Sequence, residues 1–124
     1  MLDISQNCFS GVFGGIFSTL QWLRYMSRIY ASECCLKKVF RGLTSDYVDL
    51  HRNEITSVDL HGLYATSLNL SYNQIQNISF EERQVSKLDL SYNNITDLNE
   101  SDFRGRNGRD GLYQLILKFP FGNL

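Results

Sequence analysis

The sequence predicts a repeat solenoid of the α/β type, a coil of short parallel strands joined by loops or short helical turns. Three observations predict this fold class. The stretches VDLHRNEI (48–55), LNLSYNQI (68–75) and LDLSYNNI (88–95) share one pattern of apolar residues. The pattern recurs after 20 residues, and an Asn holds the same place in each copy. A fixed period of this length is typical of architectures in which stacked units bury a common core.

Each copy contains an apolar-x-apolar pair, which indicates a short half-buried strand. Leu68 and Leu70 point to one face of such a strand, whereas Asn69 points to the other. A single copy cannot bury its apolar face, so we expect successive copies to stack as a parallel sheet about 4.8 Å apart. The paired positions are Val48 and Leu50, Leu68 and Leu70, and Leu88 and Leu90.

The recurring Asn follows each strand, where the chain turns inward. A side-chain amide offers two donors and an acceptor, which can satisfy backbone groups that the turn leaves unpaired. We therefore predict a structural ladder without a catalytic role for these residues, which are Asn53, Asn73 and Asn93.

Weaker copies of the pattern flank the three clear ones. MLDISQNCF at 1–9 is a good partial copy, and LQWLRYMSRIY at 20–30 is a poorer one, with Arg28 where Asn is expected. LYQLILKFP at 112–120 has Pro120 in that place. The anchoring apolar residues of about six units are Leu2, Leu23, Val48, Leu68, Leu88 and Leu115.

These units predict a single solenoid over residues 1–124. The repeats are well defined at 45–103, whereas 1–44 and 104–124 hold degenerate or incomplete repeats. The Gly- and Asn-rich stretch RGRNGRDG at 104–111 has the composition of turns, and we predict a looped-out insertion there.

The quoted stretches resemble the leucine-rich repeat family, whose pattern is LxxLxLxxNxI/L. The resemblance covers nearly the whole chain, and three successive copies with the Asn in place are strongly specific. It implies an arc with the short parallel strands on its concave face and loops or short helical turns on its convex face. Because a solenoid needs polar caps and this sequence opens inside a repeat, we expect a fragment of a longer extracellular or receptor-type protein.

The resemblance also implies a protein-binding module, since secreted and receptor-type members often serve recognition or signalling. The outward positions of the three clear strands are polar, acidic and rich in Tyr, and Tyr and Arg often carry interface energy. We predict partner binding on the concave face by Tyr47, Asp49, His51, Arg52, Asn69, Ser71, Tyr72, Lys87, Asp89, Ser91 and Tyr92. The alternative is a truncated or structural remnant of an array, without a ligand of its own.

An enzyme is not predicted. Asp49 and His51 share one strand face and have the chemistry of a metal site or an acid–base pair. The second Asp-Leu-His, at 59–61, lies half a repeat away, so the two copies cannot converge. We predict no catalytic residue, no cofactor and no metal. Nucleic acid is excluded as a partner, because residues 42–103 carry ten acidic and three basic residues.

The cysteines and the Asn-x-Ser/Thr sequences (sequons) indicate in which cellular compartment the protein is found. Cys8, Cys34 and Cys35 are odd in number and lack zinc-site spacing, so we predict buried or free thiols. The uncharged stretch between Asp3 and Arg24 is interrupted by polar and Gly residues, so membrane attachment is expected only if the parent protein is longer. Four possible N-glycosylation sites favour a secreted or extracellular glycoprotein, with a cytoplasmic location as the alternative: Asn69, Asn77, Asn94 and Asn99.

Overall fold

A computed structural model describes residues 1–8, 26–39, 43–60, 63–79, 84–96 and 114–118 of the chain. These residues form eight strands and no helix. The strands are β1 (Leu2–Asp3), β2 (Arg28–Tyr30), β3 (Thr44–Asp49), β4 (Ser57–Asp59), β5 (Tyr64–Asn69), β6 (Asn77–Ser79), β7 (Gln84–Asp89) and β8 (Gln114–Ile116).

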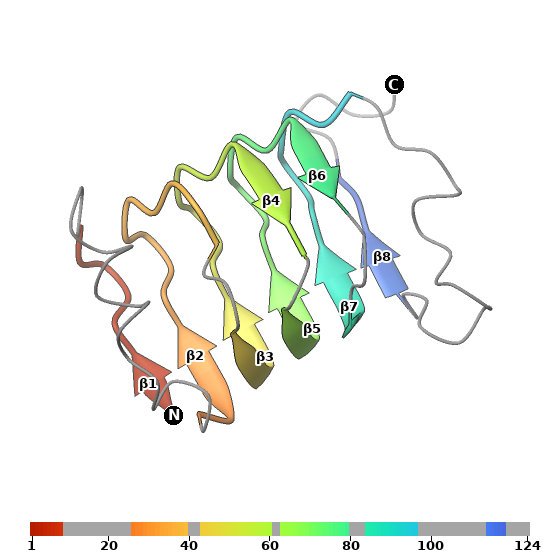
Figure 1. Cartoon of the computed structure of the whole chain (residues 1–124). Coiled ribbons are helices and arrows are strands. Elements are labelled where there is room, and N and C mark those ends of the chain that lie inside the picture. The colour runs from red at the N-terminus through yellow and green to blue at the C-terminus, as the bar shows by residue number, and fades with distance from the viewer. Residues whose placement is uncertain (9–25, 40–42, 61–62, 80–83, 97–113, 119–124) are drawn as a thin grey trace.

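The strands form two parallel sheets. Six of them make a large sheet in the order β1-β2-β3-β5-β7-β8, and β4 pairs with β6 in a small sheet (Figure 1). In Figure 1, β4 and β6 run in the opposite direction to the large sheet, as expected where each coil returns to its next strand. The described residues therefore form a repeat solenoid with one strand of the large sheet per coil.

The return side differs from the prediction of loops or short helical turns. Where the structure describes it, the chain forms the short strands β4 and β6. Their central residues, Val58 and Ile78, point inward between polar neighbours. This alternation, with a β-branched residue at the centre, favours a strand over a helical turn.

The register of the central strands follows the 20-residue period. Leu68 pairs with Val48 on one side and with Leu88 on the other, and Leu88 pairs with Leu115. Backbone hydrogen bonds continue past the strand ends, since the Leu50 N–H donates to the Asn69 carbonyl and the Leu70 N–H to the Asp89 carbonyl. The predicted stacking of these copies is confirmed.

The predicted register of the second unit was wrong. Ile29, in β2, pairs with Leu2 and with Val48, which is the place that the sequence assigned to Leu23. Arg28 therefore lies in a strand, and Cys34 occupies the position at which the Asn was expected, since the next coil has Asn53 there. The sequence pattern hid this unit, because Cys replaces the Asn that marks the others.

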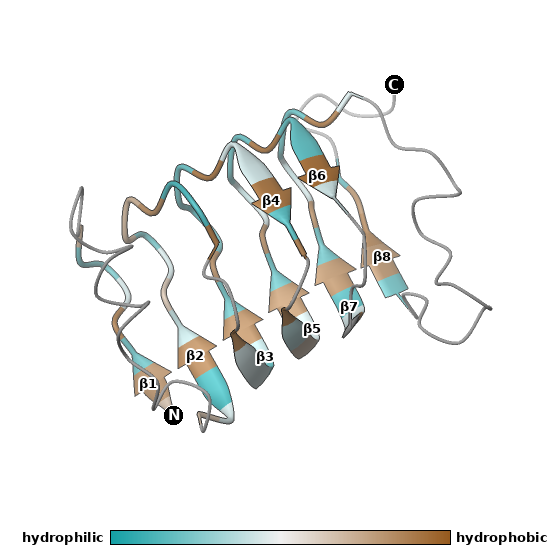
Figure 2. Cartoon of the chain, viewed as in Figure 1, coloured by the Kyte–Doolittle hydropathy of each residue, from teal (hydrophilic) through white to brown (hydrophobic). Residues whose placement is uncertain are grey.

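The core lies between the two sheets and the loops that join them. Figure 2 shows an apolar band that crosses the neighbouring strands of the large sheet at one level. The largest fully buried side chains are Ile29, Val48, Leu50, Ile55, Leu60, Leu63, Leu68, Leu70, Ile75, Leu88 and Leu90. Each coil contributes to the same core, so no coil has one of its own.

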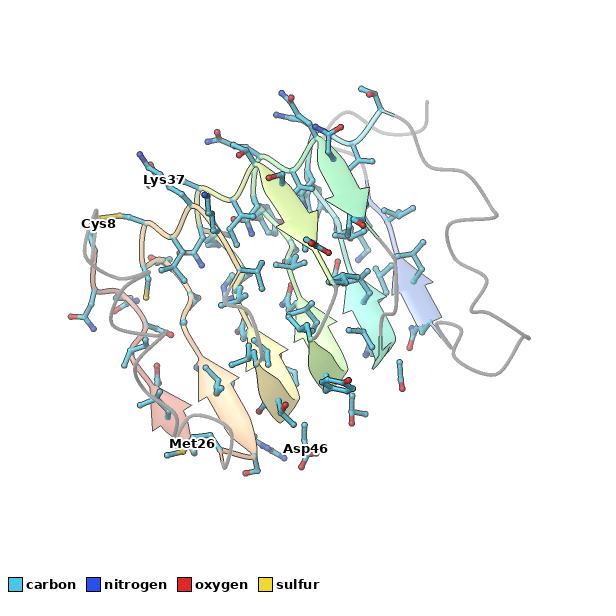
Figure 3. The ribbon with its side chains drawn as sticks, in the orientation of Figure 1. Cys8, Met26, Lys37 and Asp46 are labelled. Atoms are coloured by element: carbon cyan, nitrogen blue, oxygen red, sulfur yellow. A yellow bond between two sulfur atoms is a disulfide. The ribbon has the colours of Figure 1, made fainter. Side chains whose placement is uncertain are left out.

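The cysteines only partly match the prediction of buried or free thiols. Cys8 and Cys35 form a disulfide with Cα atoms 5.1 Å apart (Figure 3), so that prediction was wrong for both. It is confirmed for Cys34, which is a free and fully buried thiol. The Cys34 thiol donates to the Ile4 carbonyl oxygen at 3.1 Å, so it links the first two coils.

The Cys34 thiol is expected to resist alkylation while the chain is folded. Burial raises its pKa, which lowers the fraction of reactive thiolate. With the disulfide kept oxidised, iodoacetamide at pH 8 should modify Cys34 at least about tenfold more slowly in native buffer than in concentrated urea. Mass spectrometry of quenched samples gives both rates. Equal rates would contradict the buried position.

Several predictions fall on residues outside the described part of the chain. They are the anchor at Leu23, the second Asp-Leu-His with its His61, the sequon at Asn99, and the insertion at 104–111.

Candidate partner-binding surface

The three ladder residues join successive coils through their side-chain amides. Asn73 is 7% exposed, and its Nδ2 donates to the carbonyl oxygens of Leu50 and Leu70 at 3.0 and 3.1 Å. Its Oδ1 accepts from the Ile55 N–H at 3.0 Å. Asn53 and Asn93 make matching bonds. Each amide thus pairs backbone groups of its own coil with those of the preceding coil.

The residue before each ladder position has a left-handed backbone. The φ angles of Arg52, Tyr72 and Tyr92 are 56°, 57° and 58°. Glu33 and Gln6 have the same backbone form, with φ of 56° and 65°. Because side chains as different as Gln, Glu, Arg and Tyr occupy this row, the turn does not itself require Arg or Tyr.

Arg52, Tyr72 and Tyr92 form one continuous stack along the end of the strands. The Tyr72 and Tyr92 ring centroids lie 4.4 Å apart with 18° between their planes. The Arg52 guanidinium carbon lies 4.5 Å from the Tyr72 ring centroid. Stacked rings and a cation over a ring each contribute about 0.5–1.5 kcal/mol, so the three side chains hold one another in place. We call this group the Arg52–Tyr72–Tyr92 stack.

The stack is accessible from solvent. Tyr72 is 42% exposed, and among the described residues it is one of three exposed large hydrophobic side chains, with Met1 and Tyr64. Arg52 is also exposed, and Tyr92 is partly buried. The chain therefore presents an ordered aromatic and cationic surface to solvent.

The outward residue at each strand end has a local structural bond. The side-chain Oδ1 atoms of Asp49, Asn69 and Asp89 accept hydrogen bonds from backbone N–H groups two residues later, at 3.1, 3.0 and 2.9 Å. Asp3 makes the same bond to the Ser5 N–H. Such bonds satisfy the backbone as the strand turns. Each of these side chains therefore uses one oxygen to stabilise the turn of its own coil.

Asp49 and His51 also form a side-chain pair. The His51 Nδ1 and the Asp49 Oδ1 lie 2.5 Å apart, with 29% and 12% of the respective side chains exposed. Within the described ranges, no three His, Cys, Asp or Glu side chains gather where they could hold a metal ion. The geometry is that of a local pair at the end of β3.

Two surface residues were missed by the sequence reasoning. Arg28 and Tyr30 lie on β2, on the face of the large sheet that points away from the core, which we call the outer face. The Tyr30 and Tyr47 ring centroids are 5.5 Å apart. Cys34 is the residue that could have revealed them. It occupies the ladder position of this coil, and its place fixes the register of Arg28 and Tyr30 on the strand before it.

Tyr47 lies at the centre of this part of the outer face. Burial and then the Asp49 carboxylate raise its pKa, and a hydrogen bond from the Asn69 side chain acts in the opposite sense. Its phenol is therefore protonated at neutral pH and can act as a hydrogen-bond donor to a partner.

The predicted binding residues differ in how much surface they offer. Asp49, Ser71 and Ser91 are only 8%, 6% and 2% exposed, so they present little area to a partner. Arg52, Tyr72 and Lys87 are exposed, whereas Tyr47, His51, Asn69, Asp89 and Tyr92 are partly buried. Of the eleven residues predicted, the structure brings Arg52, Tyr72 and Tyr92 together most closely.

Comparison with known families agrees with this geometry. A family model described as Leucine Rich repeat matches residues 66–78 and 85–98, which cover parts of the coils of β5 and β7. The match supports leucine-rich repeats in these two coils. No curated protein and no solved structure is significantly similar to it.

Leucine-rich repeats generally mediate protein–protein interaction and are typically not enzymes. Among the described residues of this chain, the ordered and exposed side chains of the stack are the feature best suited to such contact. No helix in the described part of the chain is long and apolar enough to span a membrane.

Proposed function

We propose that this leucine-rich repeat protein binds a protein partner through the outer face of its large sheet, with the Arg52–Tyr72–Tyr92 stack as the main anchor. The observation that carries the proposal is the exposure of a stacked Tyr72 that the coil itself does not require. The repeat pattern predicts this face to be the concave one.

The stack has the physical properties of an interface anchor. Tyr and Arg are enriched among residues whose truncation weakens binding by 2 kcal/mol or more. Arg52 and Tyr92 lie against Tyr72 and restrict its motion, so a partner that packs on it loses less side-chain entropy. A fixed aromatic surface is therefore a better anchor than an isolated Tyr.

The outer face extends the contact beyond the stack. Register places Arg28, Tyr47, Ser67, Lys87 and Gln114 side by side across five strands. The Tyr30–Tyr47 pair adds a second aromatic area on the same face. A stable interface uses about 20–30 residues per partner. We therefore propose a contact of modest affinity that spans several coils.

We further propose that the protein acts outside the cell or on the extracellular face of a membrane, in recognition or signalling. The support is the Cys8–Cys35 disulfide, since such bonds form and persist in oxidising compartments, together with the sequons. A cytoplasmic location is the alternative, and there Cys8 and Cys35 would be reduced.

Partner capture with paired variants tests the proposal. The full chain, immobilised, is offered an array of extracellular proteins from its own source organism, and each retained protein is titrated. We expect the double variant Tyr72→Ala with Tyr92→Ala to bind the specific partner about 30-fold more weakly, which corresponds to about 2 kcal/mol of binding free energy.

Tyr64→Ala is the matched control. Tyr64 has the same exposure as Tyr72, 43% against 42%, but it begins β5 and lies outside the stack. It should change the affinity less than about twofold. Equal losses in both variants would contradict a specific role for the stack. A folded chain that retains no protein at all would favour the alternative, a structural remnant without its own ligand.

A further inference from the structure

We propose that Asn77 and Asn94 carry N-linked glycans and that Asn69 does not, so that sugar covers the return side of the coil and leaves the outer face open. All three lie in Asn-x-Ser/Thr sequons. The inference rests on the secretory location in the proposed function, but its choice among the sequons comes from the folded geometry alone.

The Asn77 sequon is open to solvent in the small sheet. Asn77 and Ser79 are both exposed at the two ends of β6, while Ile78 between them points toward the core. β6 is a strand of the small sheet, apart from the six strands of the large one. A glycan on Asn77 therefore extends from the return side, where it displaces no core side chain.

The Asn94 sequon is equally accessible. Asn94 and Thr96 are exposed, whereas Ile95 between them packs against the core. The backbone N–H of Asn94 donates to the Ile75 carbonyl oxygen at 3.0 Å, so its main chain is fixed by the preceding coil. Asn94 follows the ladder residue Asn93, where the chain has already left the outer face. Its side chain can bear a substituent without loss of the coil.

The Asn69 sequon is engaged within the fold. Its Oδ1 accepts hydrogen bonds from the Ser71 N–H at 3.0 Å and from the Ser71 hydroxyl at 2.7 Å. Ser71 itself is only 6% exposed. Asn69 is itself only partly exposed, and it ends β5 between β3 and β7.

A glycan on Asn69 would therefore conflict with the folded structure. The sugar bonds to Nδ2 and would rise from β5 between its neighbours β3 and β7 on the outer face. A glycan there would crowd Asp49 and Asp89, the residues in register with Asn69 on the neighbouring strands, so chains glycosylated at Asn69 should be poorly represented among folded, secreted molecules.

The modification is a transfer of an oligosaccharide from a lipid-diphosphate donor, catalysed by the transferase of the secretory lumen. A bond forms between the asparagine Nδ2 and the sugar C1, while the bond between C1 and the donor's phosphate oxygen breaks. Nδ2 loses one proton to a base, and the lipid diphosphate leaves. No oxidation or reduction takes place. The disulfide is independently consistent with passage through that compartment.

Site-resolved mass spectrometry of the full chain from its natural source tests the assignment. Treatment with a peptide N-glycosidase in heavy-oxygen water converts each occupied Asn to a labelled Asp. Trypsin cleavage at Arg52, Arg83, Lys87 and Arg104 then places Asn69 and Asn77 in one peptide and Asn94 in another. Fragmentation separates Asn69 from Asn77. We expect label at Asn77 and Asn94 in most molecules and little or none at Asn69.

Three variants expressed in the source organism complete the test. Asn77→Gln and Asn94→Gln should each remove one glycan from the intact mass, and Asn69→Gln should leave the mass of the glycans unchanged. A chain without any label, or with label at Asn69, would overturn the assignment. Partner capture by the deglycosylated chain is read separately, so a failure of the glycan assignment is distinguishable from a failure of the proposed binding.

Discussion

Asn73→Ala is expected to lower the free energy of unfolding by about 3–4 kcal/mol. Asn73 is buried in the central rung of the ladder, and its amide pairs with backbone groups on both sides. Ala removes these bonds and leaves the Ile55 N–H without its acceptor in a buried position, whereas the Leu50 carbonyl keeps a bond from the Asn53 Nδ2. Each unpaired buried polar group costs about 1–3 kcal/mol, so the loss exceeds that of one hydrogen bond.

Urea unfolding followed by circular dichroism measures this loss. The neighbouring Gln74→Ala is the matched control, because Gln74 is exposed beside the ladder. It should change stability by no more than about 0.5 kcal/mol. Similar midpoints for the two variants would mean that backbone hydrogen bonds alone hold the coils in register.

Removal of the disulfide, by Cys8→Ser with Cys35→Ser, is expected to cost about 3 kcal/mol. The bond closes a loop with a sequence separation of 27 residues, which restricts the unfolded chain. Both cysteines are replaced together so that neither can pair with Cys34. The loss should be local, since within the part of the chain that the structure describes β1 pairs with β2 alone and contributes two residues to the sheet.

Hydrogen exchange followed by mass spectrometry shows where the loss occurs. In the double variant, peptides from β1 and β2 should exchange much faster, whereas those from β5 and β7 should change little, because coils in a solenoid contact mainly their neighbours. Cys34→Ala keeps the disulfide and serves as the control for changed packing. Equal acceleration in every coil would contradict this local role.

The central coils could be predicted because their signal is local and repeated. A shared spacing gave the register of Val48, Leu68 and Leu88, and even Leu115 beyond the long gap. The position of Ile29 could not be found in this way. In this coil Cys34 stands at the ladder position in place of Asn, and its thiol donates a hydrogen bond to a carbonyl oxygen there. A search for Asn overlooks this substitution.

The pairing of Cys8 with Cys35 could not be predicted from the spacing of the cysteines in the sequence, because it depends on which side chains lie close together in the fold. Either of the adjacent Cys34 and Cys35 could have been the partner by sequence. The fold decides, because Cys34 points into the core while Cys35 is only partly buried. The direction of each side chain follows from the backbone of that turn, where Cys35 has a φ of 59°.

The candidate surface was predicted in part. The sequence placed Tyr72 and Tyr92 in register, but not their mutual stacking or the place of Arg52 over the ring. It treated Asp49, Asn69 and Asp89 as free for a partner, whereas each accepts a bond from its own turn. These bonds depend on backbone geometry that the one-letter pattern does not contain.

The equal offset between β3, β5 and β7 makes the molecule extensible by duplication. A tandem copy of residues 68–87, inserted after position 87, would begin and end at equivalent points of the coil. Each inserted copy would supply its own amide rung, and it would add one Tyr to the stack without a new junction. A single in-frame duplication could thus lengthen the binding edge by one strand spacing, about 4.8 Å, while every existing contact between coils keeps an equivalent.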